Sequence, residues 1–108
     1  MSTYNSCIES CIACMIACER CLTDCIENSR SECAELCREC ADICALTARM
    51  NARNSTFGPD ISALCAMVCS ACADECAKHA MHHEACKQCA AACRQCVGTC
   101  QVVAEELI

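Results

Sequence analysis

The chain has 108 residues, 56% of them hydrophobic, with a net charge of −6 and 19 cysteines. The acidic balance, one Tyr, one Phe and no Trp exclude a basic nucleic-acid-binding face with stacking aromatics, and the apolar runs are too short for a membrane span. Leu, Ile, Val and Phe together number only 17, so Cys and 18 alanines supply most of the apolar content. We expect one helical domain over residues 1–108, because Ala favours helices and buried Cys packs as a small hydrophobe.

The cysteines fall into four runs in which steps of three and four residues alternate. This spacing places all members of a run on one stripe of an α-helix. In a helical bundle these positions normally hold leucine and isoleucine. The runs are, in chain order, Cys7, Cys11, Cys14, Cys18, Cys21 and Cys25; Cys33, Cys37, Cys40 and Cys44; Cys65, Cys69, Cys72 and Cys76; and Cys86, Cys89, Cys93, Cys96 and Cys100.

The first two helices are expected on either side of a polar break. The first should run from about Asn5 to Asn28. Ser31 is the candidate N-cap of the second helix, which continues to about Ala52. Residues 53–60 contain the only proline and form the longest stretch without periodicity, so they should form a loop.

The last two helices follow that loop. Asp60 or Ser62 should cap the third helix, which ends near Lys78 or His79. After a polar turn at 79–83, the fourth helix should end near Glu105. Gly98 lies inside this helix, where it is a candidate point of close approach between helices.

Short connections favour antiparallel neighbours, so the sequence predicts an all-α fold, an antiparallel up-down-up-down four-helix bundle with a Cys-lined core. Aligning the runs from the first and third turns predicts flat layers of four thiols. The layers would be Cys25, Cys33, Cys76 and Cys86; Cys21, Cys37, Cys72 and Cys89; Cys18, Cys40, Cys69 and Cys93; and Cys14, Cys44, Cys65 and Cys96, with Cys7, Cys11 and Cys100 beyond them.

The cellular compartment decides whether the cysteines form disulfides. The residues before Cys7 lack a charged segment followed by an apolar one, so we expect no signal peptide and a cytoplasmic location. In reducing cytosol a cysteine cluster favours metal binding over a disulfide scaffold. Two glycines, one proline and an odd number of cysteines also argue against a loop-rich disulfide framework.

Thiolate clusters suit Cu(I), zinc or iron–sulfur clusters. Zinc takes closed sets of four ligands, and a continuous ladder of 19 thiols has no natural division into fours. The cysteine spacing of bacterial ferredoxins is absent. Cu(I) accepts two sulfurs roughly 4–5 Å apart, which suits i,i+3 and i,i+4 pairs and about one ion per thiol. A zinc or Fe–S thiolate protein, or a thiol redox-buffering or structural protein, stays open as an alternative, and no catalytic constellation stands out.

Three histidines and a methionine lie together at the predicted third turn, where imidazole and thioether could bind copper. His79 comes three residues after Cys76 and shares its helix face, so we predict that it is an outer metal ligand. His83 is a further candidate ligand, whereas the sequence does not decide a role for His82 or Met81. Met67, like Met15 and Met50, is interpreted as a core residue that fills gaps.

Over residues 5–101 the chain resembles the cytosolic copper storage proteins, bacterial Cys-lined four-helix bundles. The resemblance rests on the ladder from Cys7 to Cys25, on Glu39-Cys40-Ala41-Asp42-Ile43-Cys44-Ala45-Leu46 and on Cys76-Ala77-Lys78-His79. It implies high-capacity Cu(I) storage by the thiols, copper uptake at the end that carries the histidines, a homotetramer and no catalysis. The turn Ala80-Met81-His82-His83 departs from the family pattern.

Overall fold

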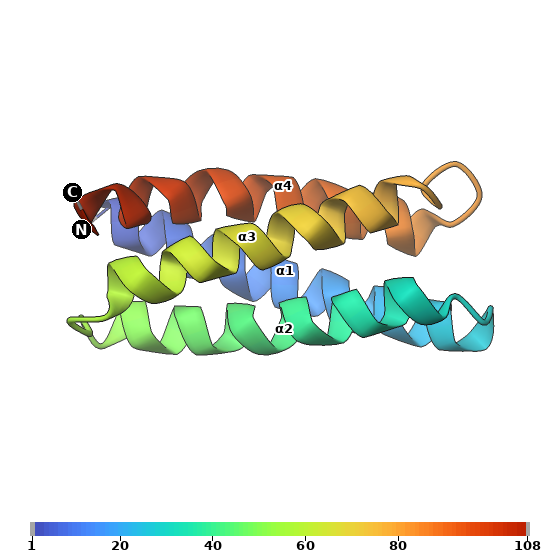
Figure 1. Cartoon of the computed structure of the whole chain (residues 1–108), viewed down its shortest axis with the longest axis horizontal. Coiled ribbons are helices and arrows are strands. Elements are labelled where there is room, and N and C mark those ends of the chain that lie inside the picture. The colour runs from blue at the N-terminus through green and yellow to red at the C-terminus, as the bar shows by residue number, and fades with distance from the viewer. Residues whose placement is uncertain (1, 108) are drawn as a thin grey trace.

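The computed structural model describes residues 2–107, with side chains from Tyr4 to Glu106. Four α-helices make up nearly all of this part of the chain, confirming the all-α prediction (Figure 1). They are α1 (Ser2–Glu27), α2 (Ser31–Ala52), α3 (Gly58–Ala77) and α4 (Glu84–Ala104), and a 3-10 helix, η1 (Glu105–Leu107), extends α4. The bundle is elongated, with extents of 40 × 19 × 18 Å.

Consecutive helices run in opposite directions, so that the N- and C-termini lie at the same end of the bundle (Figure 1). Each helix packs against two others, in the cyclic order α1, α2, α3, α4. We call the end with the α1–α2 turn and the α3–α4 loop (78–83) the histidine end, because His79, His82 and His83 belong to it. The opposite end, with the termini and the α2–α3 loop (53–57), is the asparagine end, after Asn51.

Two left-handed residues end the first two helices. Ser29 (φ 58°) follows α1, and Asn54 (φ 53°) follows α2. After each of them a backbone N–H bonds back five residues, from Arg30 to the Cys25 carbonyl (2.9 Å) and from Ser55 to the Met50 carbonyl (3.0 Å). These Schellman-type turns satisfy carbonyls that the helix ends leave free, and they fix the direction in which the chain leaves each helix.

The predicted helix caps were wrong. Ser31 is the first residue of α2, and the residue before it caps the helix without a side-chain bond. Helix α3 begins at Gly58 with Pro59 in its first turn, so Asp60 and Ser62 lie inside the helix. Proline suits a first helical turn, because its ring fixes a helical φ and its missing N–H has no helical partner there. Helix α1 also begins earlier than predicted, at Ser2.

Cysteine and alanine form the core. Cys33 is 1% exposed and the other 18 cysteines are 0% exposed, while Ala41, Ala73 and Val103 are among the few other buried apolar residues. The prediction that Met67 fills the core was wrong, because its side chain is 69% exposed. Gly98 does not mark a close approach either, since a Cβ there would meet no neighbouring atom within 4 Å. Among the described helices, none is both long and apolar enough to span a membrane.

Candidate metal centre

All nineteen cysteines are free, buried thiols. Each Sγ lies 3.5–4.0 Å from at least one other Sγ, well beyond the ~2.05 Å of a disulfide bond. The arrangement is therefore a core of thiols in van der Waals contact, and not a disulfide framework.

The thiols of α2 and α3 face one another as a ladder. The Sγ–Sγ distances are 3.8 Å for Cys44–Cys65, 3.5 Å for Cys40–Cys69, 3.9 Å for Cys37–Cys72 and 3.7 Å for Cys33–Cys76. These are the pairs that the sequence predicted for these helices, so the register of α2 against α3 is confirmed. The tight α2–α3 loop leaves the two stripes little freedom to slide.

The ladder between α1 and α4 is shifted by one cysteine from the prediction. The Sγ–Sγ distances are 3.5–3.6 Å for Cys7–Cys100, Cys11–Cys96, Cys14–Cys93, Cys18–Cys89 and Cys21–Cys86. The predicted layers were therefore wrong in their α1 members, since they paired each α1 thiol with the next one along α4. The members from the other three helices stay together as predicted, for example Cys40 with Cys69 (3.5 Å) and Cys93 (3.9 Å). The displaced helix is α1, because α4 keeps its predicted level with α2 and α3: Cys96 lies within 4.8 Å of Cys44 and Cys65. Cys21, and not Cys25, is therefore level with Cys86.

The two ladders interlock through sets of four thiols whose Sγ atoms all lie within 4.8 Å of one another. The sets draw on three or four helices and share members, so that Cys14, for example, belongs to two of them. They include Cys11, Cys44, Cys65 and Cys96; Cys14, Cys44, Cys69 and Cys96; Cys14, Cys18, Cys40 and Cys93; Cys18, Cys72, Cys89 and Cys93; and Cys21, Cys33, Cys37 and Cys76. Overlapping sets of this kind give a metal ion many alternative sulfur pairs.

Burial keeps the thiols at the histidine end protonated. Loss of solvent raises the pKa of Cys86 to about 12, and it also raises the pKa of Cys25 and of Cys33. A row of bare thiolates in such a core would be costly. A soft monovalent cation that replaces the thiol protons would leave the core neutral, and the all-sulfur donor set fits such an ion.

His79 is hydrogen-bonded to Glu75 at the surface of the histidine end. Its Nε2 lies 2.9 Å from a carboxylate oxygen of Glu75, whose other oxygen accepts a bond from Lys78 (3.2 Å). The hydrogen bond with His79 holds the pKa of the nearly buried Glu75 carboxyl below its usual range. His79 and Glu75 line a pocket of about 390 Å³ that also reaches Cys33. The structure thus places His79 beside a route to a thiol, although the sequence suggested Cys76 as its neighbour.

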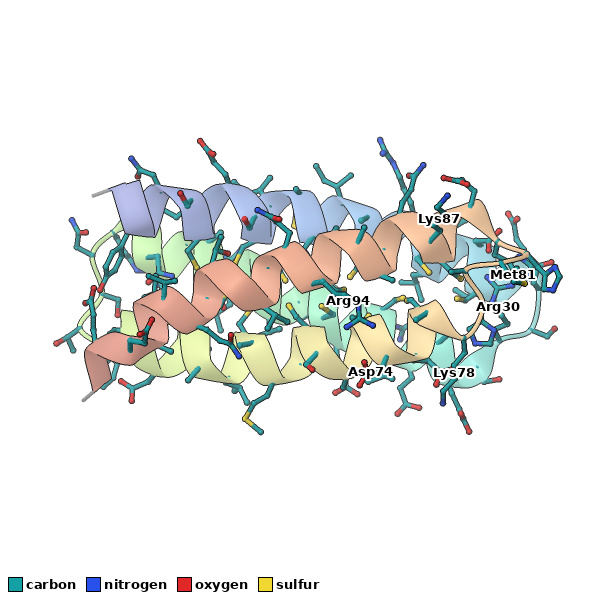
Figure 2. All side chains as sticks on the ribbon, turned by 90° about the horizontal axis from the view of Figure 1, so that it is seen from above. Arg30, Asp74, Lys78, Met81, Lys87 and Arg94 are labelled. Atoms are coloured by element: carbon teal, nitrogen blue, oxygen red, sulfur yellow. The ribbon has the colours of Figure 1, made fainter. Side chains whose placement is uncertain are left out.

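His83 contacts charged groups. Its ring nitrogens lie 3.1–3.2 Å from Nη1 of Arg30, and Nδ1 lies 3.6 Å from a carboxylate oxygen of Asp24. His82 is exposed, and Met81 is 90% exposed on the α3–α4 loop (Figure 2). Of the three histidines, His79 therefore has the position that best fits the predicted role of an outer metal ligand.

Arg30 is a residue that the sequence analysis missed. Its Nη2 donates toward Cys86 Sγ (3.3 Å) and Cys25 Sγ (3.6 Å), and it forms an ion pair with Asp24. Figure 2 shows Arg30 lying inward at the histidine end, near the loop that carries Met81. One charged residue within a polar turn gives no sign in the sequence of the direction of its side chain.

At the asparagine end the thiol stripes continue as polar side chains, which were also missed. Asn51 donates from Nδ2 to Ser62 Oγ (3.0 Å) and toward Cys7 Sγ (3.5 Å), and Thr47 is buried beside them on the α2 stripe. A signal was present, because Thr47 and Asn51 extend the steps of three and four that lead to Cys44. The thiol core therefore ends at these residues, whose amide and hydroxyl groups soft metal ions do not prefer as ligands.

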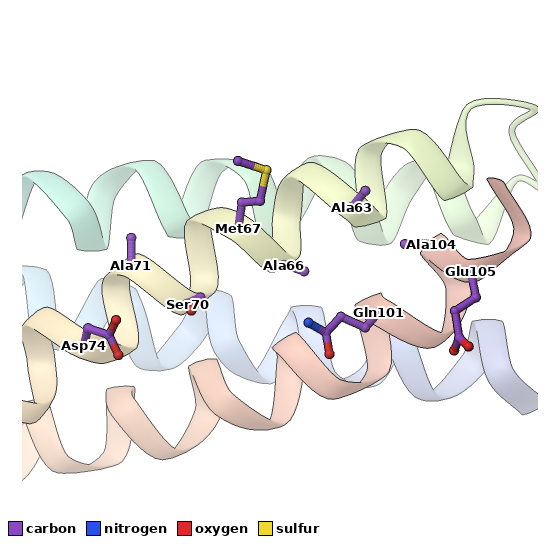
Figure 3. A pocket seen from close by; sticks show the side chains of 9 residues that line it. All are labelled: Ala63, Ala66, Met67, Ser70, Ala71, Asp74, Gln101, Ala104 and Glu105. Carbon is purple, nitrogen blue, oxygen red and sulfur yellow. The ribbon is translucent and has the colours of Figure 1, made fainter. Parts of the chain in front are cut away.

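The groove of about 1040 Å³ between α3 and α4 is a separate feature of the outer surface (Figure 3). Its lining includes Ala63, Met67 and Gln101 but no cysteine. An ion pair between Asp74 and Arg94 (3.5 Å) joins the same two helices. The groove therefore does not form part of the thiol core.

Comparison with known proteins agrees with this geometry. The sequence matches the family Csp, copper storage protein, over residues 1–105. The structure is similar to that of Cu(I)-bound copper storage protein BsCsp3, with 45% identity, a TM-score of 0.88 and coverage of 94% of this chain and 98% of that one. For the apo form of copper storage protein 3 from Bacillus subtilis the identity is 48%, the TM-score 0.87 and the coverage 93% and 97%. For a cytosolic copper storage protein from Streptomyces lividans with five coppers, the identity is 36% and the TM-score 0.91, with coverage of 96% of this chain and 93% of that one. Comparison with curated proteins gives no match.

Proposed function

Because this chain belongs to the copper storage protein family, we propose that it takes up and stores many Cu(I) ions within its thiol core. The observation that carries the proposal is the uninterrupted contact of nineteen buried, free thiols. Same-helix neighbours such as Cys14–Cys18 (3.9 Å) and Cys96–Cys100 (3.7 Å) need only a small separation to bind one ion between two sulfurs.

Cu(I) accounts for the geometry better than zinc does. A structural zinc site is a closed tetrahedron of four ligands that belong to it alone. Here Cys14 and Cys44 are each shared between two sets of four, so the sets cannot all be filled as separate tetrahedra. Two-coordinate Cu(I) needs no such division and gives up to about one ion per thiol.

The ligands in this proposal are the nineteen cysteines, with His79 as an outer ligand at the histidine end. The pocket shared by His79 and Cys33 supports the role of His79. His83 would take part only after releasing its contacts with Arg30 and Asp24. A role in storage involves no chemical conversion, so we propose that the protein is not an enzyme.

We further propose a cytoplasmic homotetramer, as the family resemblance implies. The location is supported by the similar Streptomyces lividans protein, which is described as cytosolic. Light scattering of the reduced protein measures the oligomeric state: a mass of about four chains supports the proposal, and a monomer contradicts it.

An anaerobic titration of the reduced protein with Cu(I), in competition with a chelator, tests the storage function. We expect saturation near one ion per thiol and no binding once the thiols have been alkylated. The same titration with Zn²⁺ is the control for the zinc alternative. Saturation by a few zinc ions together with weak Cu(I) binding would contradict the proposal, and no tight binding of either metal would favour a redox-buffering protein.

A further inference from the structure

The backbone of Arg30 is held in place on both sides. Its N–H bonds to the Cys25 carbonyl (2.9 Å) after left-handed Ser29, and its own carbonyl accepts from Ala34 (2.9 Å). The side chain is only 10% exposed, although arginine is rarely buried without partners. The turn therefore holds the guanidinium of Arg30 at a fixed position between the ends of the helices.

That place is the gap between two thiols of different helices. Nη2 of Arg30 lies 3.6 Å from Cys25 Sγ on α1 and 3.3 Å from Cys86 Sγ on α4. An ion bound between these two sulfurs would occupy the space where the guanidinium nitrogen lies. Arginine and a Cu(I) ion cannot both be there.

Asp24 and His83 hold the guanidinium in the gap. Asp24 forms the ion pair with Nη2, and His83 lies beside Nη1. The Nε of Arg30, however, is buried without a hydrogen-bond partner. An unpaired buried donor costs free energy that would be recovered in water, which favours a side chain able to leave.

The other side of the histidine end is open. The pocket of about 390 Å³ reaches Cys33, and Glu32, Glu75, His79 and Arg30 are among the residues that line it. The carboxylates of Glu32 and Glu75 attract a cation at this pocket, whereas Nη2 of Arg30 lies directly against the sulfurs of Cys25 and Cys86 and repels one there. The two sides of this end thus differ in access and in charge.

We propose that Arg30 is a gate: in the empty protein it occupies the metal position between Cys25 and Cys86, so that Cu(I) enters through the pocket at Cys33. The proposal rests on the proposed storage function for the identity of the ion. Arg30 is displaced only when Cys25 and Cys86 are filled, and it returns when they are emptied.

Pulsed labelling of the metal-free, reduced full-length protein with N-ethylmaleimide, mapped by mass spectrometry, tests the gate without copper. We expect Cys33 to be labelled before Cys25 and Cys86 in the natural protein. In Arg30→Ala the labelling of Cys25 and Cys86 should rise by about tenfold or more, because the charged hydrogen bonds that close the gap are lost. Cys7, at the asparagine end beside Asn51, should change little and is the internal reference.

Arg94→Ala is the matched control, since it removes an arginine paired with an aspartate on the outer surface. It should leave all labelling rates unchanged, and circular dichroism checks that both variants are folded. Stopped-flow loading should show faster Cu(I) uptake in Arg30→Ala with the same final stoichiometry. Equal labelling of Cys25 and Cys86 in Arg30→Ala and the natural protein, or labelling of these thiols before Cys33, would overturn the gate. A failure to take up copper in any variant would instead overturn the storage function.

Discussion

The side-chain amide of Asn51 on α2 donates to the hydroxyl of Ser62 on α3 over 3.0 Å, in a fully buried position. The same nitrogen lies 3.5 Å from the sulfur of Cys7, so three helices meet at one amide group. This contact lies where the thiol stripes end. It fixes the asparagine end of the bundle independently of any metal.

Replacing Asn51 by Ala should lower the free energy of unfolding of the metal-free protein by about 1–3 kcal/mol, because Ser62 loses its buried partner. Urea unfolding followed by circular dichroism measures the change. Asn5→Ala is the control, since Asn5 is exposed on α1. The Cu(I) capacity should stay the same, and a fall of several ions would mean that Asn51 is needed to hold copper.

Gly58→Ala and Gly98→Ala should have opposite effects on stability. A Cβ at position 58 would lie 2.5 Å from Asn51 Oδ1, and the amide cannot move without breaking its bonds to Ser62 and Cys7. We expect a loss of about 1–3 kcal/mol. At position 98 the added methyl meets no atom within 4 Å, so the better helix propensity of Ala should stabilise α4 by about 0.5–1 kcal/mol. Thermal unfolding of the two metal-free variants compares them, and equal shifts would contradict the packing at Asn51.

Cys18→Ser should lower the copper stoichiometry by about one ion and leave the helix content unchanged. Cys18 Sγ touches Cys14 (3.9 Å) and Cys89 (3.5 Å), and both of these thiols have another partner in Cys93. The remaining thiols can therefore pair again. Anaerobic titration gives the count; complete loss of binding from this one change would indicate a discrete cluster instead of a ladder.

His79→Ala should slow the uptake of Cu(I) from a chelator, while the final stoichiometry changes by about two ions or fewer. The imidazole lies on the pocket that leads to Cys33, and removing it leaves Glu75 with Lys78 alone. His82→Ala is the matched control, because His82 is exposed on the same loop and does not line the pocket. Stopped-flow absorbance follows the loading. Equal rates in both variants would reduce His79 to a partner of Glu75, and a collapse of capacity would make it a core ligand.

Copper loading should release protons, and the apparent affinity for Cu(I) should rise between about pH 6 and pH 8. Burial raises the pKa of Cys86 to about 12, so this thiol is protonated throughout that range and must lose its proton to bind the metal. A pH indicator in weakly buffered solution counts the protons released for each ion added. Loading that releases no protons would show that the thiols are already ionised in the empty protein.

The sequence was sufficient to predict the helices and the pairing of α2 with α3, because the cysteine period defines each buried stripe and a tight loop fixes the register. It did not predict the register of α4 against α1. The misplaced helix is α1, which joins α2 through the turn at 28–30, whereas α4 keeps its predicted register with α2 and α3. A stripe with regular steps fits its neighbour almost equally well after a shift of one cysteine.

The predicted site was incomplete at both ends of the thiol core. A turn residue such as Arg30 has no helical period to indicate its direction, and its inward path follows from the left-handed conformation of Ser29. At the other end the periodicity continues through Thr47 and Asn51. Because neither residue is a cysteine, the cysteine spacing alone did not include them. Polar residues that continue an apolar stripe are a usable sign of where a buried site stops.

The contacts among the sulfurs have a consequence for the order of storage. Steps of at most 4.8 Å connect all nineteen Sγ atoms, from Cys7 at one end to Cys25 at the other. An ion can thus advance by exchanging one thiolate for the next without ever entering water. With uptake at a single end, such a path fills and empties from the same end. The earliest ions then lie deepest, and the latest ions leave first. The copper that the cell can withdraw quickly is then set by the few thiols at the histidine end, whereas the length of the bundle sets the reserve.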